Sequence, residues 1–459
     1  MTMSGRNIGL FALMALLLMS VGFIQSWDVS LTLLNLCIIS AIMALGVNIQ
    51  WGYAGLFNVG TMGFAALGGL AAMLVSVPPV TAAWKAGGAG VVGGIVAAVV
   101  TVIAGMYAWR KTADMGRSRY WVTGLVVLVG YVVLRSLIDP AVSAIEKVDA
   151  TKAGYLGGFG LPIIFSWLVG GVFAAGAAWV VGRISLGLRS DYLAIATLGI
   201  SEIIIYMLKF EDWLTRGVKN VAGLPRPVPY EVDLNESAGF QSWATGMGLE
   251  VETASSILVK LCYAGLFSIV LLVVLYLSEV ALRSPWGRMM RAIRDNETAA
   301  AAMGKNVTSR HLQVFILGSA VIGVAGAMLT TLDGQFTPTT YQPLRFTFLI
   351  WVMVIVGGSG NNWGAVLGGF VIWFFWIEAE PIGHWLMSTL TSGMEEGHWL
   401  RLHLIESAAH MRLLTMGLVL LLVLRFAPRG LIPEVKRCRR KPVASDQPNA
   451  LNTNCHPGR

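Results

Sequence analysis

Long apolar runs are the feature that most constrains this chain. Of its 459 residues, 56% are hydrophobic and only 13% are charged, about half the charged fraction of a soluble protein. Many runs reach the roughly 20 residues that a helix needs to cross a bilayer, whereas barrel strands would be short and alternating. The sequence therefore predicts an all-α polytopic membrane protein. The net charge of +8 does not indicate nucleic-acid binding, because the basic residues gather in short loops and the tail.

The placement of the basic residues predicts the path of the chain. We expect both termini in the cytoplasm, about ten transmembrane helices, and one re-entrant broken hairpin near 346–378, since the basic tail must return inside. The first apolar run, 8–24, is interpreted as a retained helix and not a signal peptide. We divide the chain into N-terminal helices (1–80), an accessory helix pair (81–160), helices with an extracytoplasmic loop at 210–256 (161–282), a cytoplasmic segment (283–311), C-terminal helices (312–430) and a basic cytoplasmic tail (431–459).

Two Gly- and Asn-rich interruptions, 52–63 and 357–369, lie in comparable places of the two halves and suggest a weak internal repeat. Broken backbone at membrane depth is tolerated only where protein or a water-filled cavity covers it. In transporters such breaks often mark the substrate site. Asn58, Thr61 and Asn361 are therefore candidate residues of a substrate pathway. The alternative is a Gly-rich seam that packs helices.

Glu202 lies inside an apolar run, 191–209. A carboxylate at mid-membrane costs about 2.5–3.5 kcal/mol on insertion scales, so it should face the bundle interior, a cavity or a polar partner. We add it to the candidate substrate-pathway residues. A structural hydrogen bond to a neighbouring helix and a role in proton coupling are the alternatives.

The charged segment 284–304 lies between two apolar runs and predicts two short helices that meet at a corner. Ser284 can cap the first helix, Pro285 suits its first turn, and Asn296 can cap the second. Gly304 can end the second helix in the left-handed conformation. A slim, exposed second helix could enter a groove on a partner. The alternative is an ordinary basic turn.

Several motifs together resemble the LivM-like permease family of branched-chain amino-acid ABC importers. They follow the family's order and cover most of the chain outside about 80–160. The resemblance implies a permease subunit in the bacterial inner membrane, with cytoplasmic ABC ATPase subunits, a second homologous permease subunit and an extracytoplasmic substrate-binding protein as partners. The matching stretches are Gly52–Gly60, Tyr192–Glu202, Leu214–Gly217 with Gly223–Pro225, Gly287–Gly304, Val356–Gly364 and Phe426–Leu431.

In this family the 284–304 segment would dock into the ATPase. The usual Glu-Ala-Ala-x-x-x-Gly pattern places Thr298 at the acidic position, and Glu297 comes one residue early. The chain has no phosphate-binding Gly-x-x-x-x-Gly-Lys-Ser/Thr motif, so we expect no enzyme activity and no cofactor on this chain, with ATP and Mg on the partner ATPase subunits. The residues expected to couple to the ATPase are Arg288, Arg291, Arg294, Glu297, Ala299, Ala300 and Gly304.

Three alternatives remain at this stage. The cargo could be another amino acid, urea or an amide. The chain could be an ion-coupled secondary transporter or channel that uses Glu202. It could also be a membrane enzyme, because the loop 379–411 is rich in His and Glu, although its spacing fits no zinc-protease pattern. We expect no metal site, no catalytic residue and no nucleic-acid partner. Membrane lipids are the remaining partner.

Overall fold

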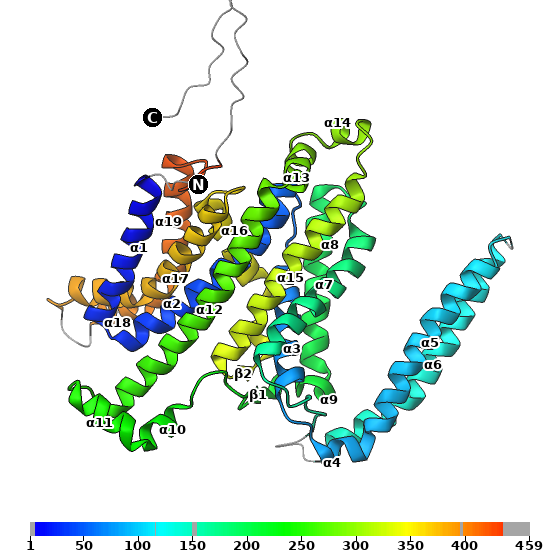
Figure 1. Ribbon diagram of the computed structural model, residues 1–459, viewed down its shortest axis with the longest axis horizontal. Coiled ribbons are helices and arrows are strands. Elements are labelled where there is room, and N and C mark those ends of the chain that lie inside the picture. Colours follow the sequence, from blue (N-terminus) through cyan, green and yellow to red (C-terminus); the bar gives the residue numbers. More distant parts are fainter. Residues whose placement is uncertain (1–4, 115, 149–153, 395–397, 435–459) are drawn as a thin grey trace, which may run out of the picture.

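The protein is a bundle of long helices joined by short connections (Figure 1). The computed structural model describes residues 5–114, 116–148, 154–394 and 398–434. Ten helices in these ranges are long and apolar enough to cross a membrane, which confirms the predicted all-α polytopic class. The basic tail beyond residue 434, with Cys438 and Cys455, and the loop residues Glu395 and Glu396 lie outside the described residues.

The first half of the chain contains one broken helix, an accessory pair and three further long helices. The helix α2 continues into a π-helical turn at Asn48–Gly52 before the chain opens. The elements are α1 (Gly5–Ile24), α2 (Trp27–Val47), α3 (Thr61–Ser76), α4 (Thr81–Ala83), α5 (Ala89–Lys111), α6 (Ser118–Lys147), α7 (Ile164–Ser185) and α8 (Ser190–Phe210).

The second half begins with short elements and ends with the second broken helix. Its only strands among the described residues are a two-residue antiparallel pair, in which Val221 faces Phe336. The elements are α9 (Asp212–Thr215), β1 (Val221–Ala222), α10 (Glu231–Glu236), α11 (Ala238–Gly246), α12 (Val251–Arg283), α13 (Pro285–Asp295), α14 (Glu297–Ala302), α15 (Val307–Asp333), β2 (Gln335–Phe336), α16 (Pro343–Gly357), α17 (Asn362–Leu390), α18 (Trp399–Glu406) and α19 (Met411–Phe426).

Glycines allow α3, α7 and α15 to pack closely at the centre of the bundle. A Cβ at Gly68 would collide with the Gly323 carbonyl, and one at Gly326 would lie 2.7 Å from the Cα of Ala65. Because lipid tails are as apolar as leucine, close packing between small residues is what holds membrane helices together. The first broken helix packs against this crossing.

The two ends of the bundle differ. The helices α13 and α14 and the first turn of α1 lie at one end, which we call the elbow end, and α9 to α11 lie at the other, the loop end (Figure 1). The predicted hairpin near 346–378 is a helix–turn–helix unit made of α16 and α17. At 1.5 Å per residue, α17 is about 44 Å long, so its second arm is longer than a re-entrant segment requires. The turn between the arms lies at the elbow end.

The accessory pair, α5 and α6, leans away from the rest of the bundle (Figure 1). The two helices pack on each other through small residues, with a Cβ at Gly90 only 2.6 Å from that of Ala141. Their outward faces are apolar, with Val102 60% and Leu128 59% exposed. The pair joins the bundle chiefly at the loop end, where α6 contacts α9.

Candidate functional site

The segment 285–302, which we call the elbow, consists of α13 and α14 with the predicted caps. The Ser284 hydroxyl accepts a hydrogen bond from the Gly287 N–H (3.4 Å), and Asn296 Oδ1 accepts one from the Ala299 N–H (2.9 Å). Gly304 is left-handed with φ of 75°. The N–H groups of Gly304 and Lys305 donate to the Ala301 and Ala300 carbonyls, which is the Schellman arrangement. The predicted corner of two short helices is confirmed.

Most of α14 faces away from the bundle. Glu297 and Ala299 are exposed, as is Gly304 after the helix, whereas Ala300 is buried. Met303 ends the helix with 81% of its surface exposed. The elbow therefore presents a slim alanine helix with one apolar side chain at its tip, a shape that suits insertion into a groove.

Two of the elbow's arginines tie it to the helix before it. Arg288 donates to the Arg283 carbonyl (3.5 Å), and Arg291 donates to the Leu282 carbonyl (3.3 Å). The last carbonyls of a helix have no partner within the helix, so these guanidinium groups satisfy the end of α12. This intramolecular role was not visible in the spacing of the arginines.

Arg294 points inward and joins three parts of the chain, an arrangement that we call the Arg294 clamp. Its guanidinium donates to the Gly52 carbonyl, at the end of the first broken helix, and to Glu434 Oε2 at 3.0 Å in the C-terminal segment. Both carboxylate and guanidinium side chains are only about a fifth exposed, at 21% and 24%. A charged hydrogen bond shielded in this way is stronger than one in open water. The elbow and the first break are therefore joined directly through Arg294.

Buried amide side chains form hydrogen bonds across the first break, residues 53–60. Asn58 Nδ2 donates to Gln50 Oε1 (2.9 Å), and Asn58 Oδ1 accepts from the Gly60 N–H (2.9 Å). Gln50 Nε2 donates in turn to the Phe315 carbonyl on α15 (2.9 Å). All these side chains are buried. Protein therefore supplies the hydrogen bonds that broken backbone lacks at membrane depth.

The second break, residues 358–361, lies against the first. The Gly360 N–H donates to Asn48 Oδ1 (2.9 Å), and Asn362 Oδ1 accepts from Asn48 Nδ2 (3.2 Å) and from the Tyr53 hydroxyl. The Leu431 N–H donates to the Val356 carbonyl (2.8 Å). Motifs from four distant parts of the sequence thus meet at the elbow end.

Three of the candidate substrate-pathway residues have structural partners. Asn58 seals the first break, and the buried Thr61 hydroxyl donates to that of Thr347 (2.9 Å). Asn361 caps α17 and donates through Nδ2 to the Pro433 carbonyl (3.2 Å). Hydrogen bonds within the protein therefore satisfy these three polar side chains, and no bound ligand is needed to explain where they lie. Their role in a substrate pathway stays a prediction.

Glu202 is partly exposed on α8, one residue after a position that touches the first broken helix. The Ser201 hydroxyl accepts from the Gly63 N–H (2.8 Å), and the Thr197 hydroxyl accepts from the Val59 N–H (3.1 Å). Within the described ranges no hydrogen bond or ion pair joins Glu202 to the other three candidates. Glu202 therefore lies near the first broken helix, and Asn361 belongs to the second break.

The loop that sequence reasoning considered for an enzyme forms the end of α17, α18 and the turn before α19. Across the part of the chain that the structure describes, no three His, Cys, Asp or Glu side chains are grouped to hold a metal ion. Two of the residues considered, Glu395 and Glu396, lie outside that part.

Sequence reasoning missed the polar residues that line the contact between the breaks. Asn48 and Gln50 close the apolar run 31–50, Tyr53 follows, and Asn362 begins α17. All four are at least 98% buried. Their signal in the sequence was a polar side chain at the edge of each glycine-rich interruption.

Two adjoining broken helices, buried in a bundle and tied to an exposed elbow, define a multi-pass membrane protein built on interrupted helices, an architecture that transporters use. Residues 113–424 match the family described as "Branched-chain amino acid transport system / permease component", and the chain belongs to this family. The match covers the elbow and the second break and begins after α5.

Curated relatives agree with the family. The chain is 28% identical to the high-affinity branched-chain amino acid transport system permease protein LivM of Escherichia coli K12, over 44% of this chain and 48% of that protein. It is 25% identical to a probable LivM of Methanocaldococcus jannaschii, over 64% and 74%. A fructose import permease protein, FrcC of Rhizobium meliloti, is 30% identical over 25% of this chain and 33% of that protein. The match spans about half the length of the Escherichia coli relative, and no solved structure matches.

Proposed function

We propose that this chain is the permease subunit of an ATP-driven importer for branched-chain amino acids. The observation that carries the proposal is the Arg294 clamp, which connects an exposed elbow to a buried pair of broken helices. An importer needs such a connection, because force applied at the membrane surface must reach the helices that open and close the pathway. Family membership and the LivM relatives support the same function.

The elbow is the proposed docking site for a cytoplasmic ABC ATPase subunit, which would place the elbow end and both termini in the cytoplasm of the bacterial inner membrane. ATP and Mg would be bound by the ATPase, because this chain has no phosphate-binding motif. A second homologous permease subunit and an extracytoplasmic binding protein complete the proposed complex. The binding protein would meet the loop end, where α10 carries the acidic residues Glu231, Asp233 and Glu236.

The proposed cycle uses the geometry in a fixed order. ATP binding draws the ATPase subunits together and shifts the elbow. The Arg294 clamp transmits the shift to Gly52, and the hydrogen bond between Asn48 and Gly360 carries it to the second break. The helices that flank the breaks then rock between outward-open and inward-open states. Asn58, Thr61, Glu202 and Asn361 are the proposed polar residues of the pathway.

The cargo is the finer part of the proposal. Relatives named for fructose and xylose transport also match, each over about a quarter of this chain, so the family architecture serves more than one solute. A branched-chain amino acid suits a bundle whose pathway candidates are few and polar within apolar walls. Uptake of radiolabelled leucine, urea and fructose by the reconstituted complex separates these cargoes, and only leucine uptake supports the proposal.

Docking of the ATPase can be tested at the tip of α14. Met303→Asp places a charge where an apolar side chain is 81% exposed, whereas Met303→Leu keeps an apolar side chain of similar size. We expect the Asp variant to lose the ATPase on co-purification and to lose leucine uptake, and the Leu variant to keep both.

The same preparation tests the ion-coupled alternative. ATP-dependent uptake that persists when the proton gradient is collapsed supports the importer. Uptake that survives ATP depletion and stops with the proton gradient would replace the proposal with an ion-coupled transporter, and Glu202→Gln would then be the decisive variant.

A further inference from the structure

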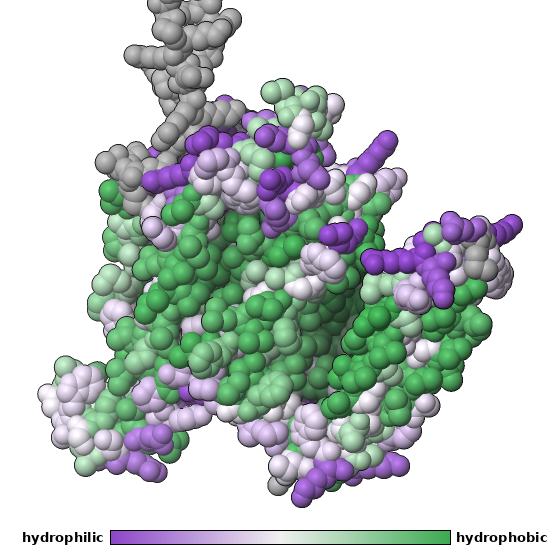
Figure 2. All heavy atoms as spheres, turned by 45° about the vertical axis from the view of Figure 1, so that its right-hand side comes forward, coloured by the Kyte–Doolittle hydropathy of each residue, from purple (hydrophilic) through white to green (hydrophobic). Residues whose placement is uncertain are grey.

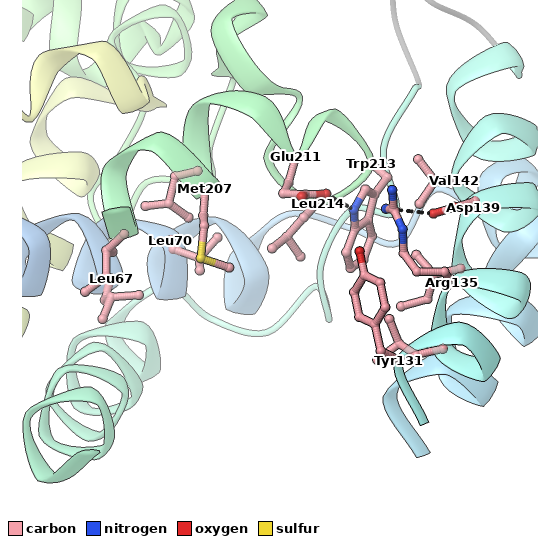
Figure 3. Close-up of a pocket in the computed structure, with 14 residues that line it drawn as sticks. Leu67, Leu70, Tyr131, Arg135, Asp139, Val142, Met207, Glu211, Trp213 and Leu214 are labelled. Atoms are coloured by element: carbon pink, nitrogen blue, oxygen red, sulfur yellow. Dashed lines mark hydrogen bonds and ion pairs between the residues drawn. The ribbon is translucent and has the colours of Figure 1, made fainter. Parts of the chain in front are cut away.

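A wedge-shaped cavity of about 490 Å³ separates the accessory pair from the bundle. Leu67 and Leu70 of α3 and Met207 of α8 line one side of the cavity (Figure 3), and α6 lines the other side, with Leu134 and Ile138 among its lining residues. Both walls are hydrophobic where the gap opens sideways (Figure 2). In a membrane such a gap cannot hold water at low cost along the wall of α3 and α8, because the side chains that these two helices contribute to the lining are all apolar.

One rim of the wedge is polar and charged. Arg135 forms an ion pair with Asp139 (2.9 Å), and Glu211 Oε2 accepts a hydrogen bond from Trp213 Nε1 (2.6 Å). These four side chains and the Tyr131 ring gather at the end of the cavity near α9 (Figure 3). The charges that line the wedge are thus one guanidinium and two carboxylates.

The rim lies at the level of lipid headgroups. Arg119 stacks on Trp109 near the elbow end of the accessory pair, and Arg135 and Asp139 follow it by about 24 and 30 Å along α6, at 1.5 Å per residue. A bilayer's hydrocarbon core is about 30 Å thick. Trp is also enriched at membrane interfaces, and Trp213 lies at this end of the wedge. The apolar part of the wedge therefore runs inward from the headgroup level near the loop end.

We propose that the wedge is a binding site for one phospholipid with a primary ammonium headgroup, such as phosphatidylethanolamine. Its acyl chains lie between α6 and the α3–α8 wall, its phosphate binds Arg135, and its ammonium donates hydrogen bonds to Asp139 and Glu211. Arginine binds phosphate oxygens in a bidentate manner. The Arg135–Asp139 ion pair is exposed and contributes little to stability, so a headgroup can share both side chains.

The charges at the rim select among lipids. Two carboxylates and one guanidinium disfavour an anionic headgroup such as phosphatidylglycerol. A quaternary choline has no N–H to donate to Asp139 or Glu211. The order of retention expected from this chemistry is phosphatidylethanolamine first, then phosphatidylcholine, then phosphatidylglycerol.

Lipid retention by the purified full-length chain tests the proposal. The chain is reconstituted in vesicles with equal parts of the three phospholipids and extracted in mild detergent, and the retained lipids are counted by native mass spectrometry. We expect one retained phosphatidylethanolamine. Arg135→Gln should weaken its retention about tenfold, the loss of one charged hydrogen-bonding partner.

A matched pair of tryptophan substitutions separates the wedge from the general lipid surface. Met207→Trp fills the wedge, and Val102→Trp adds the same ring to an outward face of α5 that is 60% exposed. Loss of the bound lipid only in Met207→Trp supports the site. Equal retention of the three lipids, equal loss in both variants, or a co-purifying polypeptide cross-linked at position 207 would overturn it.

Discussion

The centre of the bundle and the accessory pair are both apolar helical structures, yet they are built in opposite ways. The most apolar window of the α2 span is 72% buried, and the π-helical turn that follows α2 carries the buried Asn48 and Gln50, whereas the corresponding window of α6 has no buried residue. In the centre, buried amides fix one arrangement of broken helices, because an unpaired polar group at that depth is costly. The accessory pair has few such constraints and presents its side chains to lipid. The comparison separates a region of buried, hydrogen-bonded helix breaks from a region of exposed apolar helix faces.

The largest expected difference between the two regions concerns glycine. Gly326→Leu should lower the free energy of unfolding by about 3 kcal/mol, because the new side chain would collide with Ala65 backbone atoms that cannot move aside. Gly124→Leu on α6 meets no atom within 4 Å and should leave stability nearly unchanged. Thermal unfolding in mild detergent measures both. Similar losses of stability in the two variants would contradict the proposed difference between the centre of the bundle and the accessory pair.

A smaller difference is expected for a hydroxyl. The Tyr53 hydroxyl donates to Asn362 in the buried contact between the breaks, so Tyr53→Phe should cost about 1–2 kcal/mol. Tyr131 on α6 is 56% exposed, and Tyr131→Phe should cost almost nothing. Denaturant titration in the same detergent gives both values. A neutral Tyr53→Phe would show that the contact between the breaks contributes little to stability.

The smallest difference lies between two ion pairs. Double-mutant cycles should give a coupling energy of about 1 kcal/mol for Arg294 with Glu434, which are shielded, and about 0.3–0.5 kcal/mol for Arg135 with Asp139, which are exposed on one helix face. Raising the salt concentration should weaken the second pair more than the first. The reverse order would mean that the clamp is not shielded.

The sequence predicted the elements whose causes are local. Apolar runs gave the helices, and Ser284, Asn296 and Gly304 gave the shape of the elbow, because caps and left-handed glycines act within a few residues. The glycine-rich stretches correctly marked the breaks. Positive-inside reasoning also predicted a re-entrant broken hairpin near 346–378, and α16 and α17 form a helix–turn–helix unit there, although α17 extends beyond the predicted segment.

What depends on distant contacts could not be predicted. Arg288, Arg291 and Arg294 were all expected to couple to the ATPase, but Arg294 turns to Gly52 and Glu434, which are 242 and 140 residues away. Asn58 looked like a substrate ligand because its partner, Gln50, was not recognised as facing it. The wedge exists because the accessory pair leans away from the bundle. The hydrophobic pattern of the sequence predicts the helices but not the angle between them.

The measurement closest to the central claim is ATP-driven leucine uptake by Arg294→Ala, with ATP hydrolysis measured in the same vesicles. Arg183→Ala is the control, because Arg183 is exposed at the same end and stacks on Trp179. If the clamp transmits movement of the elbow, Arg294→Ala keeps the ATPase bound and hydrolysing, and its uptake falls about tenfold. The control should stay within about twofold of the unmodified complex. Equal uptake per ATP hydrolysed in Arg294→Ala and Arg183→Ala would contradict the account.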